Sequence, residues 1–441
     1  MEFDLVLTNG EIFTDGEFKK LNIGISDGKI KEISEKELSG KKVVDCEDKK
    51  ILPGLIDVHV HFRDLEQIKE ESFESGSKAA LHGGITSVID MPNNKPLTDS
   101  IERMRNKFEI AKIKMQTNYA FNFLATDSNI DECRKIKELK GVPAIKVFMA
   151  KSTGGVFLKN LKPVFELSAK EDILLVLHAE DNETIEKAKE KALENAFNDP
   201  IIHSRIHSSE AEEKAVQKAL KLQKEFDNRI HFAHVSSREA LALILKAKKK
   251  TNKISFEVSI NHLFLSEKMV GKLGNLGKVN PSLKTDVDLS KLWEAIKTNK
   301  VDLIASDHAP HLLEEKENDY FSAPSGIPAI EVMVPLLLNA VHKRFLSLEQ
   351  LCVLMSENPA RIFKLKRKGF IKKGFDADLT IIDFEREFTV TNELFTKVKW
   401  TPYAGLKLKG FVEKVVVNGI LKYDAPSVLI VKINGKVIES G

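Results

Sequence analysis

Eight apolar segments alternate with amphipathic helical stretches through the middle of the chain. This alternation is typical of βα units that surround a parallel sheet. Eight such units favour an α/β fold of the TIM-type (β/α)8 barrel over a doubly wound sheet. We expect the strands at 56–61, 86–91, 118–123, 145–148, 174–178, 230–234, 254–258 and 303–307.

The two ends of the chain have a different texture, with short β segments and tight turns. Turn signals occur at Asn9-Gly10, Asp15-Gly16 and Asp27-Gly28. Further β segments follow the helical region at 378–382, 415–419 and 428–435. We expect both ends to build one small β-sandwich. The predicted domains are therefore 1–52 with 366–441 as a discontinuous β-sandwich domain, and 53–365 as the catalytic barrel.

The composition excludes several classes of protein. The chain has 441 residues, with 68 Lys+Arg against 65 Asp+Glu and 42% hydrophobic residues, which is ordinary for a soluble globular protein. This balance indicates no nucleic-acid or membrane partner. Cys46, Cys133 and Cys352 are few, odd in number and far apart, which argues against a disulfide framework. Without a leader-like segment or a stretch of ~20 apolar residues, we expect a cytoplasmic protein.

Chemically capable side chains lie at or near the C-terminal ends of the expected strands. Active sites of TIM-type barrels lie at this end of the strands, so these side chains are expected to converge. They are His59 and His61 at the first strand, Asn93 after the second, Lys146 in the fourth, His178 and His234 at the fifth and sixth, and Asp307 at the eighth.

The His-x-His pair is the most suggestive local motif. Side chains two residues apart in a strand share a face, so His59 and His61 can hold one cation. For an isolated pair, two ordinary buried histidines would explain the motif equally well. His231 lies three residues before His234 in the expected sixth strand, so it should point to the opposite face and not act as a ligand.

Three longer motifs resemble those of the dihydroorotases, cyclic amidohydrolases of the amidohydrolase superfamily. The resemblance extends in order over almost the whole chain, although residues 64–66, 260–262 and 281–284 depart from the usual pattern. The third motif is the most specific, whereas His-x-His is shared by the whole superfamily. The motifs are Asp57-Val58-His59-Val60-His61-Phe62-Arg63, Asp90-Met91-Pro92-Asn93-Asn94-Lys95-Pro96, and Ala305-Ser306-Asp307-His308-Ala309-Pro310-His311 with Lys316.

The resemblance implies a metal centre with two Zn²⁺ ions per chain. Hydrolysing or forming a ring amide requires a polarised carbonyl and a strong oxygen nucleophile, and a divalent metal provides both as a Lewis acid that activates bound water to hydroxide. A desolvated neutral lysine can react with carbon dioxide to form an anionic carbamate. For Lys146 alone, a buried stem with an amine that reaches solvent is the competing explanation. The implied ligands are His59, His61 and Asp307 for one metal, His178 and His234 for the other, and carboxylated Lys146 as the bridge.

The resemblance also implies roles in catalysis and substrate binding. Asp307 would act as general base and then general acid, although an Asp after a strand is also a common helix N-cap. The anionic substrate, N-carbamoyl-L-aspartate or cyclic L-dihydroorotate, requires fixed cationic and amide donors. The implied substrate-binding residues are His61, Arg63, Asn93, Asn280 and His311.

The predicted function is that of a dihydroorotase in de novo pyrimidine biosynthesis. An allantoinase or hydantoinase would keep the metal site but change the substrate contacts, and the turns at Met91-Pro92-Asn93 and Ala309-Pro310-His311 favour dihydroorotase. A non-catalytic scaffold homologue is a second alternative, but such proteins typically lose ligands that are all present here. The resemblance leaves room for association with aspartate transcarbamoylase.

Overall fold

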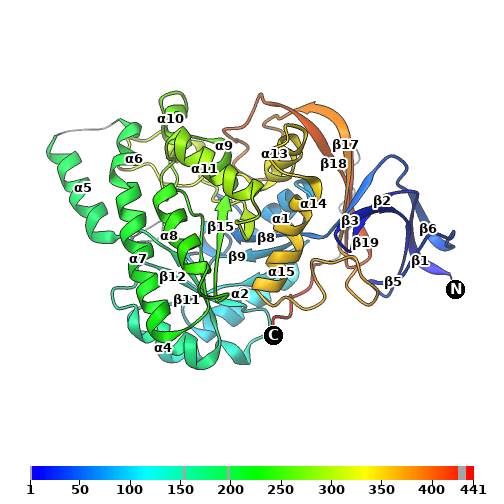
Figure 1. The fold of residues 1–441 in the computed structure, drawn as a ribbon, viewed down its shortest axis with the longest axis horizontal. Coiled ribbons are helices and arrows are strands. Elements are labelled where there is room, and N and C mark those ends of the chain that lie inside the picture. Colours follow the sequence, from blue (N-terminus) through cyan, green and yellow to red (C-terminus); the bar gives the residue numbers. More distant parts are fainter. Residues whose placement is uncertain (1, 152–154, 196–198, 426–433) are drawn as a thin grey trace.

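The computed structural model describes residues 2–151, 155–195, 199–425 and 434–441 (Figure 1). Parallel strands form its centre, and each of the eight expected strands is present near its predicted position. The second βα unit is followed by a strand that is interrupted at Asn122. The strands are β8 (Leu55–Val60), β9 (Ile85–Asp90), β10 (Asn118–Phe121) with β11 (Phe123–Leu124), β12 (Ala144–Phe148), β13 (Leu174–His178), β14 (Ile230–Phe232), β15 (Ile254–Ser259) and β16 (Leu303–Ala305).

The hydrogen bonds divide these strands into two parallel runs. One run has the order β10-β9-β8, and the other runs from β11 to β16 in chain order. An isolated parallel bridge joins Val60, at the end of β8, to His308 beyond β16. The structure is therefore of the α/β class, with neighbouring strands in the order expected for successive βα units.

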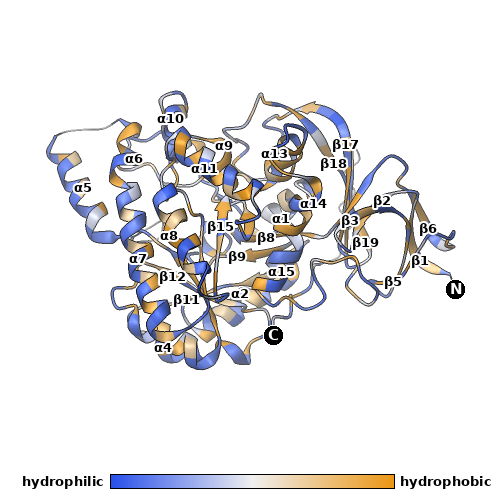
Figure 2. Cartoon of the chain, in the orientation of Figure 1, coloured by the Kyte–Doolittle hydropathy of each residue, from blue (hydrophilic) through white to orange (hydrophobic). Residues whose placement is uncertain are grey.

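The central strands are buried on both faces. Every residue of β8, β9, β12 and β13 is buried, as expected for parallel strands covered by helices. Figure 2 shows apolar residues along β8, β9 and β15. The polar exceptions within these strands include His59, Lys146 and Glu257, each at most 1% exposed. Burial of such groups requires partners, so their positions point to a site.

Helices follow the strands and surround them (Figure 1). Several begin at serine N-caps, such as Ser208 before α7 and Ser237 before α8, whose side chains accept backbone N–H bonds. The longer helices are α1 (Phe73–His82), α2 (Ile101–Lys114), α4 (Lys162–Glu171), α5 (Asn182–Glu194), α7 (Ser209–Phe226), α8 (Arg238–Lys248), α11 (Asp286–Lys297) and α13 (Ile330–His342). The shorter ones are α3 (Ile130–Lys135), α6 (His203–Ile206), α9 (Ile260–Phe264), α10 (Glu267–Leu273), α12 (Leu313–Lys316), α14 (Leu348–Cys352) and α15 (Asn358–Ile362).

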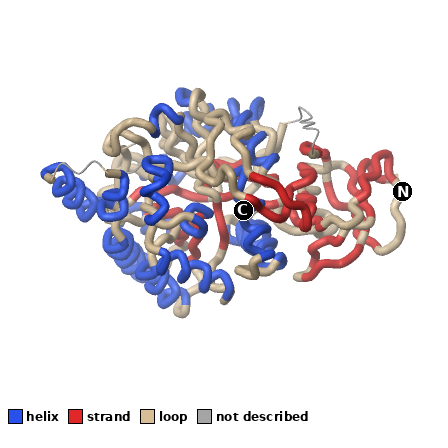
Figure 3. Tube along the Cα trace, turned by 90° about the horizontal axis from the view of Figure 1, so that it is seen from above, coloured by secondary structure: helices blue, strands red, loops and turns tan. Residues whose placement is uncertain are grey.

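Two further sheets contain strands from the chain ends. Figure 3 shows mostly strands and loops in the smaller part of the molecule, which carries the N-terminus. The four-stranded sheet has the order β5 (Lys29–Ser34), β4 (Asn22–Ser26), β1 (Phe3–Thr8) and β6 (Gly40–Asp45). The six-stranded sheet has the order β19 (Ile420–Asp424), β18 (Lys407–Val417), β17 (Leu379–Thr389), β7 (Lys50–Pro53), β2 (Glu11–Thr14) and β3 (Glu17–Lys20).

The predicted Asp-Gly turns form two-residue hairpin loops. Asp15 and Gly16 connect β2 to β3 with φ angles of 51° and 87°, and Asp27 and Gly28 connect β4 to β5 with 54° and 71°. Positive φ at both positions is what a type I′ hairpin turn requires. Most of the β segment predicted at 428–435 lies outside the described residues.

The remaining predictions from composition concern cysteines and membrane segments. Cys46, Cys133 and Cys352 are buried and free, as expected. Among the helices described, none combines the length and hydrophobicity that a membrane crossing requires.

Candidate active site and metal centre

The residues predicted from the strand ends surround one small cavity of about 30 Å³. His311 does not line this cavity, but it contacts Arg63, which does. A larger hollow of about 310 Å³ shares Asn280 and Ser325 with the cavity. The predicted residues that line the cavity are His59, His61, Arg63, Asn93, Lys146, His178, His234, Asn280 and Asp307.

His59, His61 and Asp307 form a group suited to a metal ion. The Nε2 atoms of His59 and His61 lie 3.4 Å and 3.3 Å from the same Asp307 oxygen, Oδ1. Their ligand atoms all lie within 4.8 Å of one another. Bonds of ~2.0 to 2.1 Å to a tetrahedral cation place neighbouring ligand atoms about 3.3 Å apart. The spacing therefore fits a metal.

The partners of the two imidazoles decide which nitrogen faces Asp307. Glu257 Oε1 contacts His59 Nδ1, and Asn93 Oδ1 lies 2.7 Å from His61 Nδ1. Both oxygens accept hydrogen bonds, so each Nδ1 carries the proton and each Nε2 presents a lone pair. Burial, with Arg63 as the next cause, holds the pKa of His61 well below its usual value, which keeps this ring neutral. Two lone pairs directed at one carboxylate oxygen suit a cation between them.

His178 and His234 form a second pair of candidate nitrogen ligands. Glu180 Oε2 lies 2.9 Å from His178 Nε2, which fixes the His178 proton there and leaves the Nδ1 lone pair 3.1 Å from His234 Nε2. His234 Nδ1 is buried and has no hydrogen-bond partner among the described residues. These two rings fit a second metal by their donor chemistry.

Lys146, on β12, lines the same cavity and is completely buried. Its Nζ atom has no hydrogen-bond partner in the part of the chain that the structure describes. Burial lowers the pKa of this amine to about 8, although Glu257 and Asp307 oppose the shift. The surface-reaching lysine considered from the sequence is therefore excluded. An orphaned buried amine with a low pKa fits the chemistry of carbamate formation.

Asp307 is not a helix N-cap. The next helix, α12, begins at Leu313 with Leu312 as its N-cap, so this alternative explanation is wrong. Asp307 has φ 48° and His234 has φ 35°, in the left-handed region that favours glycine. Such backbone strain is typical of functional sites. Burial raises the pKa of the Asp307 carboxyl, while His59 and Lys146 oppose the shift.

Arg63 and His311 form a polar pair beside the candidate metal ligands. Arg63 Nη2 lies 3.1 Å from His311 Nε2, and Arg63 Nε donates to the Pro310 carbonyl at 3.4 Å. His311 Nε2 also lies 3.1 Å from the Ser325 carbonyl, so this nitrogen meets a donor on one side and an acceptor on the other. Asn280 Oδ1 is buried and without a hydrogen-bond partner among the described residues. The cavity therefore combines a fixed cation and an amide at its edge.

A family model described as "Amidohydrolase family" matches residues 51–422. The chain belongs to this amidohydrolase family. Two relatives named dihydroorotase come from Pyrococcus furiosus (38% identical, 94% of this chain and 91% of the relative) and Thermococcus kodakarensis (36% identical, 97% and 96%). Solved structures of an L-hydantoinase (dihydropyrimidinase) from Arthrobacter aurescens and of a D-hydantoinase are similar in fold, with TM-scores of 0.95 and 0.92. They are 27% and 25% identical and cover 99% and 98% of this chain, and 100% and 98% of their own.

The amidohydrolase site includes residues that the sequence analysis missed. Glu257 contacts His59 Nδ1, lies 3.1 Å from His231 Nε2, and accepts the His234 backbone N–H at 3.2 Å. Burial alone raises the pKa of Glu257, but the His59 and His231 rings outweigh it and lower that pKa. A glutamate within the otherwise apolar strand expected at 254–258 was the signal available. His231 supports this carboxylate and is not among the grouped metal ligands.

A second missed group fixes the loop that carries Asn93. Lys107 is completely buried and lies 2.6 Å from Asp90 Oδ2, and it also donates to Asn94 Oδ1 at 2.6 Å. Asp90 Oδ1 accepts the Phe62 N–H at 2.7 Å, and Asn94 Nδ2 donates to the Phe62 carbonyl at 2.8 Å. This network joins the two loops of the amidohydrolase that carry Arg63 and Asn93.

Proposed function

We propose that this amidohydrolase is a dihydroorotase, which catalyses the reversible cyclisation of N-carbamoyl-L-aspartate to L-dihydroorotate with loss of water. The observation that carries this proposal is the convergence of His59 and His61 on Asp307, beside the Arg63–His311 pair. The first group suits metal-assisted amide chemistry, and the second suits a substrate carboxylate. Relatives at 36–39% identity named dihydroorotase support the choice of substrate.

The proposed metal ligands are the groups whose lone pairs lack another partner. His59, His61 and Asp307 would hold one Zn²⁺, His178 and His234 a second, and carboxylated Lys146 would bridge them. A bound metal supplies Lewis-acid polarisation of the amide carbonyl and lowers the pKa of water. The orphaned Nζ atom of Lys146 and the Nδ1 proton positions fixed by Glu257 and Asn93 support this assignment.

Asp307 is the proposed acid–base residue. In ring opening, its carboxylate accepts a proton from the attacking water and returns that proton to the ring nitrogen as the carbon–nitrogen bond breaks. The raised pKa of this buried carboxyl favours its temporary protonation. Ring closure follows the same steps in reverse.

The substrate clamp is proposed to consist of Arg63, His311, Asn93 and Asn280, with His61 at its inner edge. Arg63 offers a planar fork of donors that matches a carboxylate. Burial keeps this guanidinium in a region of low dielectric, where its interaction with an anion is strengthened. A ring substrate without a carboxylate gains little from this arrangement.

A hydantoinase activity is the second candidate, because the similar solved structures are hydantoinases. The experiment that separates the candidates compares initial rates on L-dihydroorotate, hydantoin and allantoin with one metal-loaded preparation. We expect L-dihydroorotate to give the highest kcat/KM. A higher kcat/KM on hydantoin would refute the dihydroorotase assignment while leaving the metal site intact.

We further propose that β8 to β16 close into a (β/α)8 barrel over residues 53–365, and that residues 1–52 and 366–441 form a discontinuous β-sandwich domain. The Val60–His308 bridge and the His61 N–H bond to the His308 carbonyl at 2.8 Å support closure. The shared six-stranded sheet supports the pairing of the chain ends. We place the enzyme in cytoplasmic pyrimidine biosynthesis, with aspartate transcarbamoylase as a candidate partner.

A further inference from the structure

The connection between β17 and β18, residues 390–406, reaches the loop that carries His311. Trp400 lies on this connection, is 4% exposed, and donates its Nε1–H to the His311 carbonyl at 2.8 Å. We propose that Trp400 is a positioning residue that holds His311 against Arg63 and thereby sets the affinity for the substrate carboxylate. This inference rests on the proposed function and assigns a specificity role to a segment far from the metal ligands in the sequence.

The contacts of Trp400 extend to a second part of the cavity wall. Lys316 Nζ lies 5.9 Å from the centre of the Trp400 ring. The same ammonium donates to the carbonyls of Pro324 at 2.9 Å and Gly326 at 3.0 Å. Gly326 lines the cavity. Gly326 lies close against Ala309 and His311, so Trp400 lies beside both the His311 loop and the lysine that fixes the segment next to that loop.

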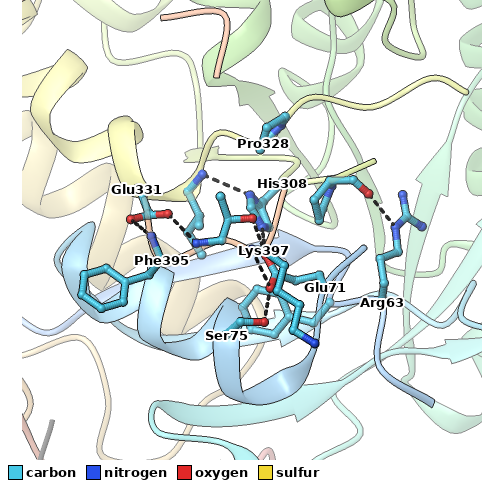
Figure 4. A network of polar contacts seen from close by, with 12 residues as sticks. Arg63, Glu71, Ser75, His308, Pro328, Glu331, Phe395 and Lys397 are labelled. Carbon is cyan, nitrogen blue, oxygen red and sulfur yellow. Dashed lines mark hydrogen bonds and ion pairs between the residues drawn. The ribbon is translucent and has the colours of Figure 1, made fainter. Parts of the chain in front are cut away.

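Buried carboxylates hold one end of the connection. Glu331 on α13 accepts the backbone N–H groups of Phe395 and Thr396, each at 2.9 Å. Glu71 contacts the Thr396 hydroxyl and accepts the Lys397 N–H at 3.4 Å. Figure 4 shows Glu71 and Glu331 on either side of this segment, with His308 close to Glu71 and Arg63 beyond. Glu71 and Glu331 are 0% and 6% exposed, so the segment is held by buried, charge-assisted bonds.

The other end of the connection is also fixed. Thr401 donates to the Pro328 carbonyl at 3.2 Å, and the Tyr403 hydroxyl donates to Asn261 Oδ1 at 3.0 Å. Asn261 in turn donates to the Ser306 carbonyl at 3.4 Å, next to Asp307. Trp400 thus lies between two anchored stretches. These anchors fix the position of its indole N–H relative to the His311 loop.

The chain contains a matched control for this residue. Its other tryptophan, Trp293 on α11, is 7% exposed and donates Nε1–H to the Leu263 carbonyl, also at 2.8 Å. Trp293 packs against Phe264 and Phe345 and does not line the cavity. Replacing either indole with phenylalanine removes one buried hydrogen bond to a carbonyl, so both changes should reduce stability to a similar extent.

The first test measures steady-state kinetics on L-dihydroorotate with metal-loaded protein. We expect Trp400→Phe to raise KM roughly 3- to 30-fold with a smaller change in kcat, because an unpaired carbonyl loosens the clamp rather than the metal site. Trp293→Phe should leave KM unchanged. Equal KM values for both variants and the wild-type protein would overturn the inference. If the wild-type protein does not turn over L-dihydroorotate at all, the proposed function fails instead.

The second test does not require Trp400→Phe to fold. In Trp293→Phe, Trp400 is the sole tryptophan, so its emission reports on the His311 loop. Addition of N-carbamoyl-L-aspartate should shift this emission, and the midpoint of the shift should equal the KM of the same variant for N-carbamoyl-L-aspartate. In the double variant Trp293→Phe, Arg63→Met, the emission should shift only at a much higher concentration of N-carbamoyl-L-aspartate. An emission unchanged at saturating N-carbamoyl-L-aspartate, in a variant that turns it over, would contradict a link between Trp400 and the clamp.

Discussion

The Nη2 atom of Arg63 lies 3.1 Å from the Nε2 atom of His311, which joins two of the predicted substrate-binding residues into one pair. Arg63 follows His61 directly beyond β8, while His311 follows Asp307 beyond β16. The pair therefore bridges the two loops that also carry proposed metal ligands. Mutation can separate the function of the Arg63–His311 pair from that of the proposed metal ligands.

Arg63→Met should weaken the use of L-dihydroorotate and leave the metals bound. Breaking a buried, charge-assisted contact commonly costs roughly 2 to 5 kcal/mol, or about one and a half to four decades in kcat/KM. Steady-state kinetics and metal analysis on the same sample measure both effects. Asp307→Asn is the contrasting variant, and it should lower kcat with little change in substrate affinity. An unchanged kcat/KM in Arg63→Met would show that the carboxylate clamp is misassigned.

Glu257→Gln should weaken metal binding without removing a ligand. The carboxylate accepts the Nδ1 proton of His59, and loss of such a partner typically reduces metal affinity by about 10- to 100-fold. Competition with a chelator of known affinity measures the change. Asp378→Asn is the control, because this buried carboxylate contacts Lys368 and Asn118 and no proposed ligand. Equal metal affinity in both variants would argue against the role of Glu257.

Lys146→Ala should abolish activity, because it removes the proposed bridge between the two metals. Short carboxylic acids such as acetate should restore a small part of the activity by replacing the carbamate. Mass measurement of the wild-type protein under native conditions should also distinguish the carboxylated chain from the unmodified chain. Unmodified Lys146 in fully active, metal-loaded protein would rule out carboxylation.

Lys278 should make the stability of the protein depend on pH in the alkaline range. Burial, with Lys189 as the next cause, lowers the pKa of this amine from 10.5 to about 8. Between these values the unfolded chain binds a proton that the folded chain does not, so the free energy of unfolding rises with pH. Relative to Lys278→Met, the wild-type value should rise by about 1 to 3 kcal/mol from pH 8 to 10.5. Chemical denaturation at each pH measures the free energy of unfolding. If this free energy changed with pH by the same amount in both proteins, the lowered pKa would be contradicted.

Much of the fold was predictable because the burial pattern of parallel strands is strong in the sequence. The segments around His59, Lys146 and His178 are short apolar runs in which one or two polar residues stand out, and each is a buried strand in the structure. The Asp-Gly hairpins were predictable because few other residues adopt positive φ at low cost. The sequence alone did not show the interruption at Asn122 or the early end of β14 at Phe232.

The candidate-site residues that the sequence predicts lie in or near the expected strands or within motifs that resemble the family. Glu257 and Lys107 were missed because their roles depend on partners that are distant in sequence, His59 in one case and Asp90 in the other. Trp400 was missed for the same reason, since nothing near it in the sequence indicates that its indole meets the His311 loop. Contacts between distant segments arise from tertiary packing, so the spacing of residues within one segment does not predict them.

The most direct test of the central claim is a metal titration of activity. Protein stripped of metal by a chelator is titrated with Zn²⁺, and ring opening of L-dihydroorotate is measured at each step. We expect no activity in the stripped protein, and activity that rises with added Zn²⁺ and reaches its maximum at about two equivalents per chain, because His59, His61 and Asp307 are proposed to hold one ion and His178 and His234 another. Full activity in protein shown to be free of metal would contradict the proposed mechanism.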